Sequence, residues 1–176
     1  MSTIFVDTTQ ETNGDGTFET PYNYLPPGYL EAGNTIYITM QSTLNEIDID
    51  FDTEDPFKLI GYDPTVDTEY WEGDANADIE PEDPEIVVHP RFFPSANTGP
   101  IIYASKGEYC ININTQLATM SETPLLTFQN LRLFGWSDRA ILVQLPLSTM
   151  NLVQENVNTI TPPANAGWRT ITIMTV

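Results

Sequence analysis

The sequence is poor in cysteine, histidine and basic residues: it has one cysteine (Cys110), one histidine (His89) and only six Lys and Arg. A single cysteine excludes an intramolecular disulfide and a thiolate metal cluster within one chain. The basic residues are outnumbered by 25 Asp and Glu, which gives a formal net charge of −19 at pH 7. A surface of this sign repels phosphate backbones and anionic lipid, so we expect no nucleic-acid partner and no membrane partner.

Long apolar runs are also missing. No stretch approaches the roughly 18 apolar residues that a membrane span requires. Residues 1–7 carry neither the basic region nor the apolar region of a signal peptide. We therefore expect a soluble protein, made in the cytoplasm, without a signal peptide or a transmembrane segment. With 176 residues, of which 40% are hydrophobic, the chain is long enough for a single domain with a buried core.

The acidic residues that are present are concentrated in one block. Residues 46–85 hold 16 of the 25 carboxylates and only one cation, Lys58. The remainder of the chain after residue 85 is nearly neutral. A solvated acidic face and a site for cations both account for such a block.

Short β-rich runs, separated by Gly, Pro, Asn and Asp, dominate the pattern, and helical periodicity is nearly absent. Alternation is clear at residues 47–52, where Ile47, Ile49 and Phe51 alternate with three aspartates. The expected strands are residues 3–7, 35–40, 46–51, 57–62, 85–89, 100–105, 109–114, 125–134, 140–145, 150–160 and 169–176.

Two asparagines distinguish a coil of strands from a β-sandwich. Asn130 and Asn156 occupy similar apolar contexts 26 residues apart, a period typical of repeat architectures. Asn tolerates the left-handed conformation of a bend, and its amide can bond to its equivalent in the next repeat. The C-terminal half also lacks the Asn-Gly or Asp-Gly turns that join antiparallel strands. Both observations favour a parallel coil.

The chain resembles the right-handed parallel β-helix proteins of pectate-lyase-like architecture, a class that includes phage and virus tail-spike and decoration proteins. Residues 4–7 and 13–22 look like the family's first strand, Gly-Asp-Gly loop and Pro-aromatic lead into a cap. Residues 30–38 are similar to its turn from cap to first rung. Residues 59–63 look like the end of a rung before an excursion, and residues 125–134 like an inner rung.

This resemblance implies an all-β fold: a short right-handed parallel β-helix of about five to seven rungs. A single domain is expected overall, with an N-terminal strand and cap over residues 1–34 and rungs over residues 35–176. An acidic insertion interrupts the rungs at residues 63–85. Pro26 and Pro27 interrupt the cap, so any helix there must be short or missing. No cap is visible after residue 176, which favours assembly or truncation over a free monomer.

The insertion contains a candidate Ca²⁺ loop. Asp74, Asn76 and Asp78 match the start of a calcium-binding loop, and Glu85 falls at its twelfth position. Ile79 stands where an EF-hand has Gly, so the loop is not an EF-hand. A solvated acidic loop without a metal is the alternative.

Candidates for catalysis are few. His89 lacks an acidic partner in sequence, and Cys110 alternates with Asn112, which places it on a polar face as a passive thiol. Because β-helix relatives cleave polysaccharides, Arg132 and Arg139 are the only basic cluster that could serve a lyase. A hydrolase would instead need two carboxylates about 5–9.5 Å apart.

Exposed aromatics offer a sugar-binding alternative. Trp71 and Trp136 could stack on pyranose rings, whereas packing in a core or an interface is the preferred alternative except for Trp71, which lies in the acidic insertion. No catalytic residue is assigned.

Together these observations predict a non-enzymatic structural or attachment component of a larger assembly. The predicted class is a phage or viral virion protein, such as a capsid decoration, fibre or tail-spike segment. Its partners would be other virion proteins or copies of itself, for example in a trimer, and Ca²⁺ is the one candidate cofactor. The alternatives are a polysaccharide-degrading lyase or hydrolase, or a fragment of one, and a carbohydrate-binding surface repeat protein.

Overall fold

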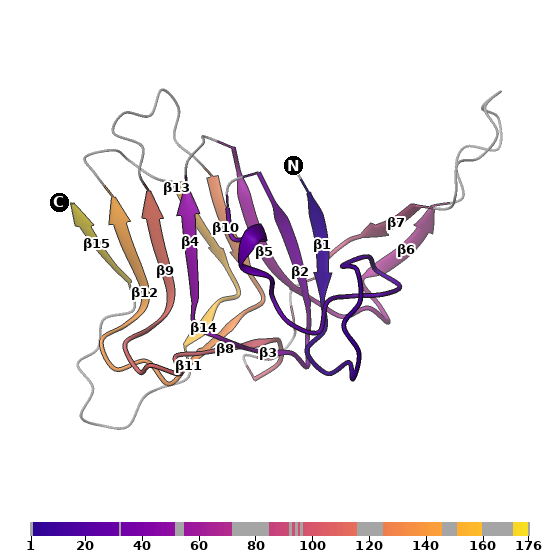
Figure 1. Cartoon of the computed structure of the whole chain (residues 1–176), viewed down its shortest axis with the longest axis horizontal. Coiled ribbons are helices and arrows are strands. Elements are labelled where there is room, and N and C mark those ends of the chain that lie inside the picture. The colour runs from indigo at the N-terminus through magenta and orange to yellow at the C-terminus, as the bar shows by residue number, and fades with distance from the viewer. Residues whose placement is uncertain are drawn as a thin grey trace.

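The computed structural model describes residues 2–31, 33–51, 55–71, 85–91, 93, 95, 97–115, 125–145, 151–159 and 171–175. Its strands form three parallel sheets that line a coil, and one antiparallel hairpin projects from the coil at the N-terminal end (Figure 1). In the described residues, the one helical element is a 3-10 turn, η1 (Pro27–Tyr29). The expectation that Pro26 and Pro27 leave little room for a helix is confirmed.

The three parallel sheets are named here A, B and C. Sheet A consists of β1 (Thr3–Val6), β2 (Thr35–Thr39), β5 (Phe57–Tyr62), β10 (Leu125–Gln129) and β13 (Asn151–Glu155). Sheet B consists of β4 (Ile47–Phe51), β9 (Tyr109–Thr115), β12 (Arg139–Leu145) and β15 (Ile171–Thr175). Sheet C consists of β3 (Thr43–Asn45), β8 (Ile101–Tyr103), β11 (Arg132–Phe134) and β14 (Asn158–Thr159).

The chain visits the sheets in the fixed order A, C, B. The turns are β2-β3-β4, β5-β8-β9, β10-β11-β12 and β13-β14-β15, and each strand pairs in parallel with its equivalent in the next turn. This succession is that of a short parallel β-helix, as predicted. Within the described residues, four complete turns follow the leading strand β1, one fewer than the smallest predicted number of rungs, five; β1 adds a fifth strand to sheet A alone. The right-handed sense, which the twist of strands favours, stays a prediction.

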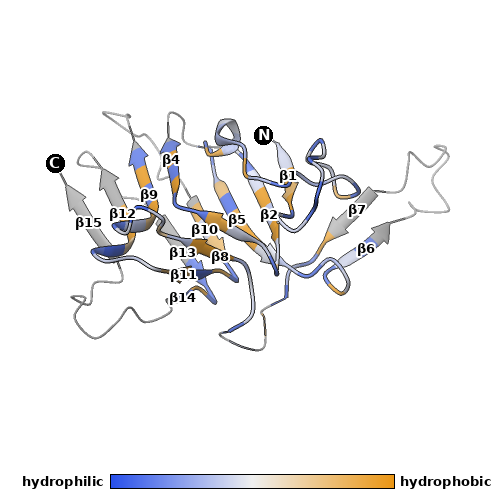
Figure 2. Cartoon of the chain, turned by 60° about the horizontal axis from the view of Figure 1, so that its bottom comes forward, coloured by the Kyte–Doolittle hydropathy of each residue, from blue (hydrophilic) through white to orange (hydrophobic). Residues whose placement is uncertain are grey.

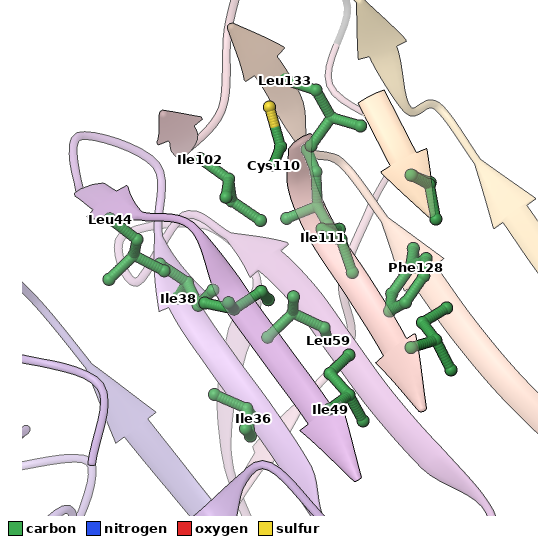
Figure 3. Close-up of a cluster of buried hydrophobic side chains, with 14 of the residues drawn as sticks. Ile36, Ile38, Leu44, Ile49, Leu59, Ile102, Cys110, Ile111, Phe128 and Leu133 are labelled. Carbon is green, nitrogen blue, oxygen red and sulfur yellow. The ribbon is translucent and has the colours of Figure 1, made fainter. Parts of the chain in front are cut away.

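Inward side chains stack on their equivalents in neighbouring turns. In sheet A the register places Ile36 beside Leu59 and Leu59 beside Phe128, and none of the three is exposed to solvent. Figure 3 shows these side chains converging with those of sheets B and C on the coil's interior. Fully burying one such side chain contributes about 1.5–3 kcal/mol, so the stacked rows are the main source of stability.

Strand β4 shows how the sequence separates the inside from the outside. Ile47 and Ile49 are buried, whereas Asp48 and Asp50, which alternate with them, are exposed. Figure 2 shows the same alternation of hydrophobic and hydrophilic residues along β4 and β9. The alternation that the sequence predicts at residues 47–50 is therefore confirmed.

The N-terminal segment covers the free edge of β1. The Phe5 N–H donates to the Gly16 carbonyl at 2.9 Å, and the Tyr22 N–H donates to the Phe5 carbonyl at 3.0 Å. On the outer face of sheet A, the Phe18 ring packs edge-on against Phe5, with 5.6 Å between centroids, and Tyr37 stacks on Phe5. These contacts occupy backbone groups that would otherwise be open to pairing with another chain.

The excursion leaves the coil after β5 and returns at β8, so it is longer than the predicted insertion at residues 63–85. It contains the antiparallel pair β6 (Thr68–Trp71) and β7 (Glu85–Val88). Its base is held by Asp67, which is 2% exposed. The Asp67 carboxylate accepts the Asp63 N–H at 2.8 Å and the Arg91 Nε–H at 2.8 Å. This acid therefore ties the outgoing and returning segments together.

Asn130 forms the corner between β10 and β11, and Asn156 forms the equivalent corner between β13 and β14. Their φ angles are 56° and 55°, and the Asn156 amide donates to Asn130 Oδ1 at 2.8 Å. The predicted asparagine ladder, with left-handed backbone at both residues, is confirmed. It also splits the expected strands 125–134 and 150–160 into two strands each.

The Asn130 side chain also binds the excursion to the coil. Its amide donates to the Gly61 carbonyl at 3.0 Å and to the Arg91 carbonyl at 2.7 Å, and its Oδ1 accepts the Phe93 N–H at 3.2 Å. The residue is 1% exposed. Three separate segments thus depend on one buried amide.

Replacing Asn130 should be among the most destabilising single changes. Asn130→Ala leaves buried carbonyls without donors and places Ala at a positive φ, so the free energy of unfolding should fall by about 3 kcal/mol. Asn130→Gly tolerates the backbone and should lose less. Urea unfolding followed by circular dichroism measures both. Asn114→Ala is the control, because its amide reaches Asp50 only at 3.4 Å; equal losses at the two asparagines would contradict the ladder's importance.

Candidate binding faces

Most of the predicted cation site lies outside the described residues. Asp74, Asn76 and Asp78 belong to this undescribed part, and Glu85 is described only as the first residue of β7, paired with Trp71 of β6. The Ca²⁺ hypothesis for the loop and the sugar-stacking hypothesis for Trp71 therefore stay predictions. Among the described residues, no group of three or more acidic, His or Cys side chains is arranged to hold a metal ion.

Trp136 packs in the core instead of standing on the surface. It is 2% exposed and belongs to the cluster of buried hydrophobic side chains. A pyranose cannot reach a ring that is covered in this way, so the sugar-stacking role considered for Trp136 does not fit its position. Core packing, the alternative given by the sequence, accounts for it.

The basic residues considered for a lyase are engaged in local contacts. The Arg139 guanidinium pairs with Asp138, its neighbour in sequence. The Arg132 Nε–H donates to the Gly99 carbonyl at 2.7 Å. His89 is exposed, and its Nε2 lies 4.0 Å from a Glu69 carboxylate oxygen. Each of these residues thus has a local partner, and the lyase role considered for Arg132 and Arg139 stays a prediction.

Cys110 lies inside the coil and not on a polar face. Its side chain is fully buried and its thiol donates to the Phe134 carbonyl at 3.4 Å. Burial raises the pKa of this thiol to about 12, because a thiolate would lose its hydration there. The polar-face expectation fails because Cys110 is at the start of β9, where the coil turns its corner, while Asn112 follows on the outer face.

We predict that Cys110 is inert in the folded protein. At pH 8, iodoacetamide should alkylate it at least about 100-fold more slowly in buffer than in denaturing urea, because the reactive thiolate is suppressed. Mass spectrometry over time gives both rates. Comparable rates in the two solutions would contradict the buried position.

The outer face of sheet B carries a row of polar side chains that bond from one turn to the next. The Asn112 amide donates to Asp48 Oδ1 at 2.8 Å, and the Tyr109 hydroxyl donates to the same oxygen at 3.1 Å. The next row repeats the pattern, with Asn114 donating to Asp50. Asp48 and Asp50 thus have amide partners in the next turn.

Glu46 is at the corner between sheets C and B. Its carboxylate accepts hydrogen bonds from the Ser105 N–H at 2.8 Å and from the Ser105 hydroxyl, and it lies 3.1 Å from Lys106 Nζ. The side chain is 7% exposed. The Ser105 hydroxyl, aided by Lys106, lowers the pKa of Glu46 to about 2 from 4.5. This cluster joins two turns and neutralises one acid.

Glu46 should make stability depend on acid pH. Because its pKa is lower in the folded state, its contribution is complete above pH 4.5 and is lost as the pH falls toward 2. Glu46→Gln should therefore cost about 1 kcal/mol at pH 7, and the difference from the parent should shrink below pH 4.5. Urea unfolding across this range tests it, with the exposed Glu108→Gln as control. A difference that does not change with pH would refute the assignment.

The outer face of sheet C carries an exposed aromatic pair. Tyr103 and Phe134 occupy equivalent positions in successive turns, and Asn45 precedes them in the same row. Their rings stack with 5.6 Å between centroids and 26° between planes, and each residue is 40% exposed. The buried Leu44, Ile102 and Leu133 of the same strands face the interior, so the aromatic rings must point outward.

The pair is held in place by its surroundings. Gly135 has φ 82°, and a Cβ there would come within 2.5 Å of the Tyr103 ring, so the ring rests against bare backbone. The Phe134 carbonyl accepts the Ala104 N–H at 2.9 Å. These contacts hold the Tyr103 ring against the Gly135 backbone and fix the backbone of Phe134.

The sequence gives little sign of this pair. Residues 101–103 read Ile-Ile-Tyr, and every one of them is apolar or aromatic. Alternation cannot show which side faces outward in such a run. The sequence feature that could have indicated the aromatic pair is Gly135, directly after Phe134, because a glycine leaves room for a neighbouring ring.

Comparison with known proteins gives no match: no family model fits the chain, and no curated protein or solved structure is similar to it. In its described part, the chain has no helix with the length and apolar character of a membrane span. The assignment to the parallel β-helix class therefore rests on the strand succession and the register.

Proposed function

We propose that this protein is a non-enzymatic structural and attachment component of a larger assembly. A phage or viral virion protein, such as a capsid decoration, fibre or tail-spike segment, is the class we favour, with synthesis in the host cytoplasm. The observation that supports it is the in-register stacking of parallel strands through four turns. A stack in which every turn is bonded to the next resists bending, and this property suits a part that holds others at fixed spacing.

The charge distribution is compatible with this role. A net charge of −19 keeps isolated copies apart in solution. Association must therefore use surfaces where the acids are sparse or neutralised. Other virion proteins, or further copies as in a trimer, are the proposed partners. Bound Ca²⁺ at Asp74, Asn76, Asp78 and Glu85 would reduce the repulsion between copies.

A carbohydrate-binding surface repeat protein is the second candidate. The observation that favours it is the exposed, pre-positioned pair of Tyr103 and Phe134. Aromatic side chains with exposed rings can stack against the apolar faces of sugars. This function is compatible with the first, because attachment to a surface glycan is one way in which an assembly component acts.

The proposal predicts a defined oligomer. Multi-angle light scattering of the purified protein should give a trimer or larger species, and about millimolar Ca²⁺ should stabilise it if the acidic loop binds the ion. A monomer at all concentrations, with or without Ca²⁺, would contradict the assembly proposal. Release of unsaturated products from polygalacturonate would instead favour the lyase alternative.

A further inference from the structure

The outer face of sheet C differs from the rest of this acidic molecule. We call it the neutral face and define it by the outward positions of β3, β8, β11 and β14. Its residues are Thr43, Asn45, Ile101, Tyr103, Arg132, Phe134 and Asn158. None of these residues is a carboxylate, whereas Asp48 and Asp50 occupy the outward rows of sheet B. At the adjoining corner between sheets C and B, Glu46 is paired with Lys106 at 3.1 Å and Asp138 with Arg139, and Glu108 is exposed.

Charge limits what this face can bind. A polyanion approaching it meets the field of a chain with net charge −19, which raises the cost of association. A neutral ligand meets no such cost. Arg132 contributes a half-buried guanidinium whose orientation is fixed by its bond to the Gly99 carbonyl, and it can donate hydrogen bonds to neutral oxygens.

Area limits the ligand further. Strands of two or three residues make the face about 10 Å wide, and turns about 4.8 Å apart make it about 15–20 Å long. The resulting area is on the order of 200 Å², against about 800 Å² per partner in a stable protein interface. This face by itself is therefore too small for a stable interface with a second copy of this chain, and a short stretch of polysaccharide fits it.

We propose that the neutral face binds an uncharged glycan, whose apolar ring faces contact Tyr103 and Phe134. Asn45, next to Tyr103 in the row, and Arg132 supply hydrogen-bonding groups for hydroxyls beside the aromatic pair. Because the Tyr103 ring rests against Gly135 and stacks on the Phe134 ring, little of its side-chain freedom is lost on binding. This inference deepens the proposed attachment function by naming the class of ligand, and it rests on that function.

Affinity electrophoresis in native gels tests the inference on the full chain. The gels contain dextran, galactomannan or hydroxyethyl cellulose as neutral probes, and polygalacturonate or alginate as acidic probes. At least one neutral glycan should retard the protein, and the acidic glycans should not. Tyr103→Ala and Phe134→Ala should each weaken the retarding affinity at least tenfold, as expected for a buried aromatic contact.

Matched variants keep the result interpretable. Tyr24→Ala removes an aromatic residue that is 50% exposed and lies far along the chain from the face, and it should bind as the parent does. Phe134→Tyr keeps an aromatic ring and should retain binding even if Phe134→Ala folds poorly, which circular dichroism would reveal.

Three results would overturn the inference: no retardation by any neutral probe, retardation that survives loss of both rings, or tighter binding of the acidic glycans. A fall in oligomer mass in Tyr103→Ala without any effect on glycan binding would assign the face to a second copy, and would also overturn it. Because oligomer mass is measured separately by light scattering, glycan binding can fail while the assembly proposal stands.

Discussion

Burial between equivalent positions of successive turns is the constraint on which this structure depends. Leu59 has Ile36 one turn before it and Phe128 one turn after it, and all three side chains are buried. No turn can bury its inner row alone, so the fold requires that strands of different lengths and sequences keep a common register. The coil is thus stable only as a stack, and every other feature has to leave the stacking intact.

The corner asparagines keep that register where the coil is interrupted. The chain leaves after β5 and returns at β8, with the hairpin β6-β7 between them. At that point Asn130 bonds to Gly61 of the departing segment and to Arg91 and Phe93 of the returning one. The next turn is then aligned by Asn156. Asparagine thus both forms the bend between two strands and bonds to the neighbouring segments, because its amide has both donors and an acceptor.

A stack with a fixed interior leaves its outer faces free to differ. Sheet A has its outer face partly covered by the N-terminal segment, through Phe18 and Phe5. Sheet B displays carboxylates that are bonded to amides of the next turn. Sheet C displays the aromatic pair and has no acid among its outward residues. The proposed attachment role follows from this division, since a rigid interior lets one face specialise without disturbing the others.

The sequence by itself determined the all-β class, the inward and outward alternation in β4, the asparagine corners and the shortness of the cap, because each depends on local conformational preference. It missed β3, where Leu44 is the one inward residue of a three-residue strand and no alternation can be detected. Only the tertiary structure decided that Cys110 and Trp136 are buried and that Tyr103 and Phe134 meet. These outcomes depend on which turns lie next to each other and on where the coil bends. The residue pattern along a single strand contains no information about either.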